Sequence, residues 1–117
     1  MKINTKNKPR TFIVGKDIKT TISHEADIEL KPNEQVTFLT ASGTELDFVR
    51  KSWGYYATPS VNKRLKKFGF KTALIQNKDG NIYICVVEAL ELDLFNDYCK
   101  DRQQTVLSWL DEIFCKS

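Results

Sequence analysis

The sequence contains little of what catalytic and metal sites need. Its 117 residues include one histidine, His24, and three widely spaced cysteines. Because no Cys-x-x-Cys pair occurs, we predict neither a zinc knuckle nor a disulfide framework, and we expect Cys85, Cys99 and Cys115 to be reduced. A catalytic triad would have to use His24, which no Gly-x-Ser-x-Gly elbow accompanies. We therefore predict no catalytic residue, metal or cofactor, although the absence of a motif leaves enzymatic activity undecided.

Long apolar runs are missing as well. No segment approaches the roughly 20 apolar residues of a membrane-spanning helix. Residues 1–10, MKINTKNKPR, carry charge but no following apolar stretch that would act as a signal peptide. Glycine-rich phosphate loops of the Walker or dinucleotide type are also absent. We expect a cytoplasmic protein with no membrane partner.

Acidic residues are absent from one long stretch of the chain. Eight lysines or arginines and no acid lie between Phe48 and Lys78, whereas from Asp79 onward eight acids accompany three basic residues. This segregation has two interpretations. The two halves are solvated faces of opposite charge that attract each other, or the basic part is a surface that concentrates anionic ligands.

Length and composition predict one domain with a hydrophobic core, since 41% of the residues are hydrophobic. Residues 1–10 have too little apolar surface to offset the entropy of ordering, so we expect a flexible basic tail. The remainder, 11–117, is expected to form a single α+β domain. Its fold class would be a mainly antiparallel sheet with a short basic helix and an acidic amphipathic C-terminal helix.

Alternation of apolar residues predicts the strands, and the loop NKDGN at 77–81 predicts a hairpin. Residues 82–87 are apolar on both faces, which is typical of a central strand that is covered on both sides. Residues 105–114 fit either a helix or a strand, and we favour a strand. The predicted strands are 11–15, 20–30, 35–40, 45–49, 71–76 and 82–89.

Two helices are expected. One spans 90–100 and has apolar residues four apart opposite a row of aspartates. The other runs from Pro59 to Phe68, with Thr58 as its N-cap, proline in its first position and Gly69 as its stop. Its start would present N–H groups and hydroxyls to a phosphate or carboxylate.

The segment from Arg50 to Phe70 contains the candidate ligand site. Arginine and lysine would neutralise phosphate, the aromatic rings would stack on a sugar or base, and the hydroxyl and amide groups would hydrogen-bond to the ligand. The same aromatic residues would also suit a hydrophobic core. The predicted ligand-binding residues are Arg50, Lys51, Trp53, Tyr56, Thr58, Ser60, Asn62 and Arg64.

The phrase ELDFVRKSWGYYATPSVNKRLKKFGFKTALI, with ISHEADIELKPNEQVTF before it and WLDE after it, carries a resemblance. It resembles a family of small uncharacterised bacterial proteins that are often encoded among genes for surface-polysaccharide and nucleotide-sugar biosynthesis. The resemblance covers most of the chain beyond residue 10 and brings no catalytic residue with it. It implies glycan-related work in preference to nucleic-acid binding.

These observations lead to one main hypothesis and two alternatives. The main hypothesis is a small accessory protein that binds an anionic ligand, a phosphorylated sugar or nucleotide-sugar, beside a biosynthetic enzyme. The first alternative is a single-stranded nucleic-acid binder, which the acidic second half and the pI of 8.7 disfavour. The second is a protein-interaction module, which includes association of the chain with itself as a homo-oligomer.

Overall fold

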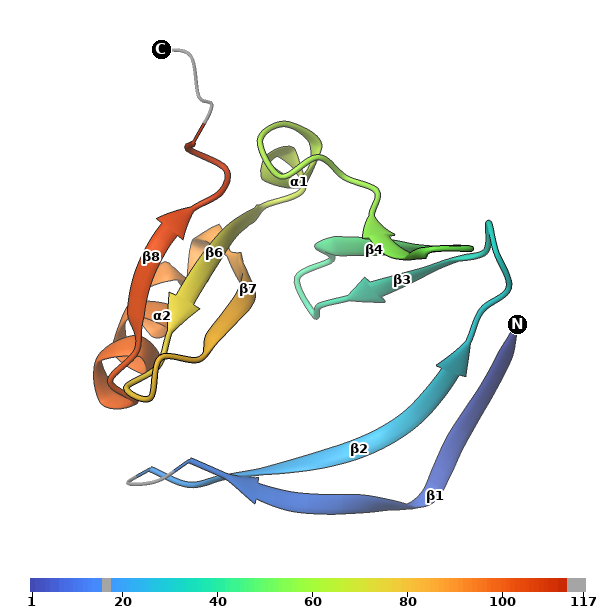
Figure 1. The fold of residues 1–117 in the computed structure, drawn as a ribbon, viewed down its shortest axis with the longest axis horizontal. Helices are drawn as coiled ribbons and strands as arrows, with labels where there is room; N and C mark the ends of the chain where they lie inside the picture. The colour runs from blue at the N-terminus through green and yellow to red at the C-terminus, as the bar shows by residue number, and fades with distance from the viewer. Residues whose placement is uncertain (16–17, 114–117) are drawn as a thin grey trace.

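A computed structural model describes residues 1–15 and 18–113. The fold is mainly antiparallel sheet with two α-helices, and in the described part the strands form three separate sheets (Figure 1). In chain order the elements are β1 (Lys2–Val14), β2 (Thr20–Glu29), β3 (Gln35–Leu39), β4 (Glu45–Lys51), β5 (Gly54–Ala57), α1 (Arg64–Lys67), β6 (Phe70–Gln76), β7 (Ile82–Glu88), the 3-10 turn η1 (Ala89–Glu91), α2 (Leu92–Asp101) and β8 (Thr105–Trp109).

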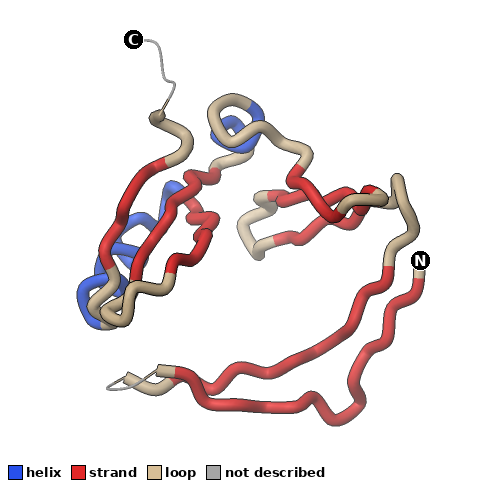
Figure 2. The backbone as a smooth tube through the Cα atoms, in the orientation of Figure 1, coloured by secondary structure: helices blue, strands red, loops and turns tan. Residues whose placement is uncertain are grey.

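The first sheet is the long hairpin of β1 and β2, which arches beneath the other two sheets (Figure 1). Residues 1–10, expected to be a flexible basic tail, belong almost entirely to β1, which starts at Lys2 and pairs with β2 from Lys2 opposite Glu29 onward. Figure 2 shows strand along nearly all of this segment. The register shifts only between Thr5 and Arg10, around Pro9, which has no N–H to donate. Backbone hydrogen bonds to β2 therefore hold residues 2–10 in a strand, although these residues bury little apolar surface.

The second sheet has the order β3-β4-β5 and is built from two tight connections. Val36 pairs with Phe48 between the first two strands, and Val49 pairs with Tyr56 between the second two. Gly54 follows the β4–β5 turn with a φ of 148°, a conformation that glycine adopts most easily. This turn places the aromatic and basic residues of the predicted site at one end of the sheet.

The third sheet contains most of the buried core and has the order β7-β6-β8. The hairpin predicted around NKDGN is confirmed, with Phe70 opposite Glu88 and Gln76 opposite Ile82. The central position predicted for residues 82–87 is wrong, because β6 occupies the centre and β7 lies at the edge. Among the described residues most of the buried apolar side chains belong to β6 or to elements packed against it; they are Leu30, Pro59, Leu65, Phe70, Ala73, Ile75, Val87 and Cys99.

Helix α2 lies across one face of the third sheet (Figure 1). Its Phe95 ring meets the Trp109 ring of β8 edge to face, with centroids 5.7 Å apart. The strand favoured for the last segment is observed over Thr105–Trp109, residues 110–113 form a turn, and Phe114 lies outside the described residues. None of the described helices has the length and apolar character required to cross a membrane.

Helix α1 is shorter than predicted and begins later. It comprises only Arg64–Lys67, and Thr58 is not its N-cap. The chain from Pro59 to Lys63 forms a bend and a turn instead, in which the backbone N–H of Leu65 donates to the Ser60 carbonyl. Leu65 is buried and fixes this short helix against β6. A single turn with one buried anchor replaces the three-turn amphipathic helix that the apolar spacing suggested.

Candidate functional site

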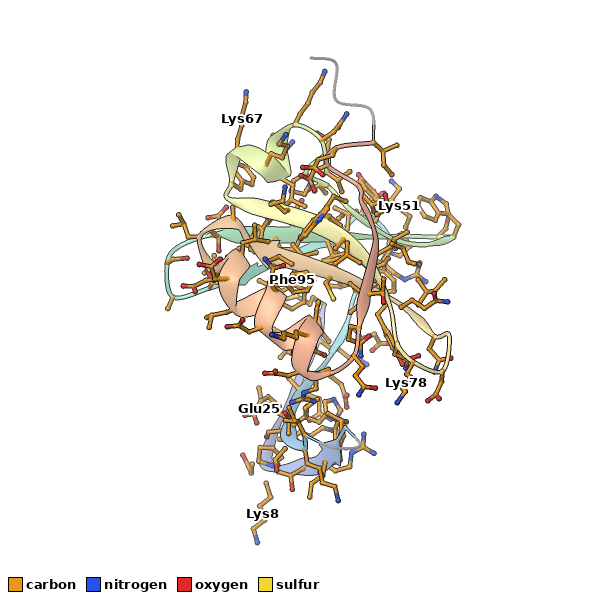
Figure 3. All side chains as sticks on the ribbon, turned by 90° about the vertical axis from the view of Figure 1, so that its left-hand side faces the viewer. Lys8, Glu25, Lys51, Lys67, Lys78 and Phe95 are labelled. Carbon is orange, nitrogen blue, oxygen red and sulfur yellow. The ribbon has the colours of Figure 1, made fainter. Side chains whose placement is uncertain are left out.

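The structure divides the eight predicted ligand-binding residues between two places. One group lies at the β4–β5 turn, at the far end of the second sheet, and the other precedes or begins α1. Figure 3 shows this separation through two labelled lysines, since Lys51 at the turn and Lys67 on α1 lie on different sides of the molecule. The turn group is Arg50, Lys51, Trp53 and Tyr56, and the α1 group is Thr58, Ser60, Asn62 and Arg64.

The side chains of the α1 group mostly contact other parts of the chain and are not directed toward a ligand. The Thr58 hydroxyl oxygen is buried and has no hydrogen-bond partner among the described residues, so it does not face solvent. The Ser60 hydroxyl accepts from the backbone N–H of Arg64 at 3.2 Å, and the Arg64 guanidinium lies 5.8 Å from the centre of the Phe68 ring. Asn62 is half-buried in the preceding turn. A four-residue helix also has little dipole, so the predicted anion site at its start is not built here.

The turn group presents aromatic surface to solvent. The rings of Trp53 and Tyr56 are stacked, with centroids 6.2 Å apart and planes inclined by 24°. Trp53 is 70% exposed and Tyr56 is 43% exposed. A tryptophan is usually well buried because its large apolar surface favours the core, so a mostly exposed one suggests a contact outside the chain.

The alternation of side chains along the strands decides which cations accompany this stack. Tyr56 is opposite Val49, and Lys51 lies two residues further along β4, on the same face. The Lys51 ammonium donates to the Asn33 side-chain oxygen at 2.6 Å. Arg50 is opposite Tyr55 on the other face, where its guanidinium lies 5.5 Å from the centre of the Tyr55 ring.

The turn therefore has two cation–aromatic faces. The first consists of Lys51, Trp53, Tyr56 and the Asn33 amide, and we call it the Trp53 face. The second consists of Arg50 and Tyr55. Arg50 and Arg64, which were both expected to neutralise the phosphate of the ligand, thus belong to different elements, β4 and α1.

The other basic residues of the 50–78 stretch do not form one surface with the turn. Lys71 pairs with the completely buried Asp111, its ammonium 3.1 Å from a carboxylate oxygen, and lies 4.8 Å from the centre of the Trp109 ring. Burial alone would lower the pKa of Lys71, but the hydrogen bond and charge of Asp111 raise it above its usual value. This lysine stabilises the fold and is not available to a ligand.

Two hollows that the sequence did not reveal lie between the β1–β2 hairpin and the rest of the chain. The larger, of about 800 Å³, is lined by residues of β7, of the α2 region and of the hairpin, among them Tyr83, Ile84, Tyr98, Arg102 and Val14. The smaller, of about 480 Å³, is lined by apolar residues of the hairpin and Phe38, and also by four polar residues of the hairpin, Arg10, Ser23, His24 and Glu25. Neither contains a predicted site residue. The only sequence signal for the larger hollow was the apolar character of both faces of residues 82–87.

A cluster of hydroxyl groups surrounds one carboxylate between the second and third sheets. Thr40, Ser42 and Thr44 of the β3–β4 loop all donate to the same oxygen of Glu88 at the end of β7. These hydrogen bonds, the one from Ser42 first, lower the pKa of Glu88. A carboxylate whose pKa is lowered is a weaker base, so the cluster serves to tie the two sheets together.

The remaining titratable groups do not form a catalytic arrangement. The His24 ring is near the Asp27 carboxylate at 2.9 Å and the Ala26 carbonyl at 3.1 Å, on the hairpin. Burial raises the pKa of the Cys85 and Cys99 thiols, so they are poor nucleophiles. Cys115 lies outside the described residues. Within residues 1–15 and 18–113, no three histidine, cysteine or acidic side chains group as metal ligands would.

Exposed aromatic rings beside a lysine can stack on a planar or sugar ring while the ammonium neutralises a phosphate. Of the surfaces described, only the Trp53 face combines these groups within the predicted site. Comparison of the chain with protein-family models, curated proteins and solved structures found no match, so the functional argument rests on this geometry.

Proposed function

We propose that the protein is a non-catalytic binding protein that recognises a phosphorylated sugar or nucleotide-sugar through the Trp53 face. The observation that supports it is the stacked, solvent-exposed Trp53–Tyr56 pair with Lys51 on the same side of β4 and β5. The rings would stack on the sugar or base, Lys51 would meet the phosphate, and the Asn33 amide would contact a hydroxyl. A role beside a polysaccharide-biosynthesis enzyme is part of this proposal.

Because the Trp53 face is an open surface and not a pocket, we expect its affinity for a small ligand to be modest. Ligand pockets bury most of a small molecule's surface, whereas a stacking face contacts only one side of it. We expect binding in the micromolar to millimolar range, which suits a ligand that is presented on a larger carrier or enzyme. Arg50, on the opposite face, would add attraction by its charge without a direct contact.

Isothermal titration with a nucleotide-sugar, its free nucleoside diphosphate, its sugar phosphate and the unphosphorylated sugar tests the proposal. The three phosphorylated compounds should bind and the neutral sugar should not. Removing the stacking ring in Trp53→Ala should weaken binding by roughly 5- to 160-fold, because a stacked ring contributes about 1–3 kcal/mol. No heat or thermal stabilisation from any compound at millimolar concentration would contradict the proposal.

A matched pair of variants locates the site. Tyr56→Ala removes a ring of the Trp53 face, and Tyr98→Ala removes an equally exposed ring from α2, at 43% and 44% exposure respectively. Tyr56→Ala should weaken binding, and Tyr98→Ala should leave it unchanged. Equal effects of the two changes would show that the ligand does not use the β4–β5 turn.

Single-stranded nucleic acid is the second candidate, since an open aromatic face accommodates a chain of bases better than a pocket does. The dependence of affinity on salt separates the two. Each phosphate neutralised on a single strand contributes a slope of about −0.7 in log affinity against log salt concentration. The Trp53 face supplies one cation, Lys51, and Arg50 lies on the opposite face of the same turn, so the slope should be no steeper than about −1.5, whereas a slope near −3 with single-stranded RNA would favour nucleic acid.

A further inference from the structure

The described chain leaves an unusual amount of apolar surface exposed. Large apolar side chains are exposed on all three sheets, and among the described residues only eight apolar side chains, Pro59 included, are buried. Isolated exposed apolar side chains are normal in monomers, but contiguous apolar patches mark surfaces that another molecule covers. The exposed apolar side chains that lie close together are those around the two hollows.

Strand β7 is the clearest case. It lies at the edge of its sheet, so one side of its backbone has no neighbouring strand in the part of the chain that the structure describes. Residues 82–87 include no charged residue or proline, which are the usual protections of an edge strand. Ile84 is 70% exposed, and Ile82 and Tyr83 are exposed too. The sequence of β7 is therefore typical of a central strand, although β7 lies at the edge of its sheet.

The β1–β2 hairpin shows the same mismatch on its concave side. Its register places Phe12 opposite Ile22 on one face, and these residues line the smaller hollow with Phe38. The residues that alternate with these along β2, Ser23, Glu25 and Asp27, are polar and exposed, and the first two also border the smaller hollow. An amphipathic hairpin of this kind is expected to rest on a hydrophobic body, but here it encloses hollows instead.

The surface area gives the size of the missing contact. The chain exposes 8771 Å², whereas a compact 117-residue monomer exposes about 6,500 Å². Its radius of gyration is 16.0 Å against about 13.5 Å for a compact domain of this length. The excess of roughly 2,000 Å² per chain is within the range that one subunit buries in an obligate dimer.

We propose that a second copy of this chain covers the β7 edge and the concave face of the hairpin in a two-fold symmetric dimer. A two-fold axis beside β7 brings the same strand of the partner alongside in the antiparallel direction, which is the pairing that this sheet already uses. One apolar surface can thus complement itself without a different protein. The dimer gives β7 the central position for which its sequence is suited.

Sedimentation equilibrium over a range of protein concentrations tests the proposal. The wild-type chain should have twice the 13.5 kDa mass of the monomer. Ile84→Glu should weaken dimerisation by at least about 30-fold, because it places an unpaired charge at the centre of the interface. Ile84 is largely exposed in the single chain, so this change should not prevent folding, which circular dichroism checks. Ile22→Glu, in the concave face, provides a second variant with the same expectation.

The matched control is Ile13→Glu, on the opposite face of the same hairpin and 66% exposed. It should remain a dimer. A wild-type monomer at all concentrations would overturn the proposal, and so would a monomer whose radius of gyration in X-ray scattering is near 13.5 Å, since the hairpin would then have closed on its own chain. Equal dissociation of Ile13→Glu and Ile84→Glu, or a larger oligomer, would also overturn it.

Discussion

Replacing Asp111 by alanine should destabilise the protein substantially. Asp111 is completely buried, and its carboxylate accepts from the backbone N–H of Thr72 and from the Lys71 ammonium, both at 3.1 Å. Without it, the buried Thr72 amide loses its acceptor, at a cost of about 1–3 kcal/mol, and a charged hydrogen bond is lost as well. Lys71 keeps a second acid, Glu112 at 3.4 Å, and so is not left without a counter-charge.

Removing one partner of a buried ion pair lowers the unfolding free energy by about 3–5 kcal/mol. Because Lys71 still pairs with Glu112, we expect a loss near the lower end, about 3 kcal/mol, for Asp111→Ala. That is a large part of the stability of an ordinary domain. Asp111→Asn retains an oxygen for the Thr72 amide and should lose only about 1–2 kcal/mol. Urea unfolding followed by circular dichroism measures both losses, at one fixed protein concentration, because association shifts apparent stability.

The exposed Asp97 of α2 supplies the control, and Asp97→Ala should change the unfolding free energy by less than about 0.5 kcal/mol. A loss below about 1 kcal/mol for Asp111→Ala, with a cooperative transition, would refute the reasoning. It would mean that water replaces the carboxylate at this position.

The same carboxylate predicts how stability depends on pH. Burial alone would raise the pKa of Asp111, but the Thr72 N–H and Lys71 hold it below its ordinary value of 3.8. The unfolded chain therefore binds the proton at higher pH than the folded chain. The contribution is complete above about pH 5 and is lost as pH falls through the lowered pKa. Wild type should lose more stability than Asp111→Asn between pH 5 and pH 2, and parallel profiles would contradict this.

Three further predictions concern the core, the thiols and the exposed tryptophan. Ile75 is a buried residue of β6, and Ile75→Ala should lower the unfolding free energy in urea by about 2–5 kcal/mol, whereas Leu94→Ala on the exposed side of α2 should lower it by less than about 1 kcal/mol. In a Cys115→Ser variant, Cys85 and Cys99 should react slowly with a thiol reagent at neutral pH and rapidly in urea, and fast reaction of the folded protein would contradict their raised pKa. Trp53→Ala should leave the unfolding free energy within about 0.5 kcal/mol of wild type, and a loss above about 1.5 kcal/mol would assign Trp53 to the fold instead of to a ligand.

Local sequence patterns predicted most of the strands because a strand needs only alternation and a suitable turn. The Asn77 side chain illustrates this, since it accepts from the backbone N–H of Asp79 and of Asn81 and so closes the hairpin loop through neighbours alone. The first part of β1, residues 2–10, was missed because its order comes from pairing with β2, a contact that composition does not report. Helix α1 was overestimated because apolar spacing does not reveal that the chain before Arg64 folds back on Ser60.

The candidate site was predicted only in part. The aromatic and basic residues around Gly54 share one turn, and their proximity follows from adjacency in the chain. Sequence could not decide that Lys51 accompanies the Trp53–Tyr56 stack while Arg50 lies on the other face, since this depends on the register of β4 against β5. Nor could it separate Arg64 from the turn, because that distance depends on where the β5–α1 connection leaves the sheet.

The sequence by itself determined the antiparallel strands, the hairpin loops and the concentration of rings and cations near Gly54, because each arises from residues close together in the chain. The tertiary structure alone decided which strand lies at an edge, which carboxylate is buried and which apolar face stays uncovered. Those properties depend on contacts between distant segments, such as Lys71 with Asp111, and on what surrounds each side chain after folding.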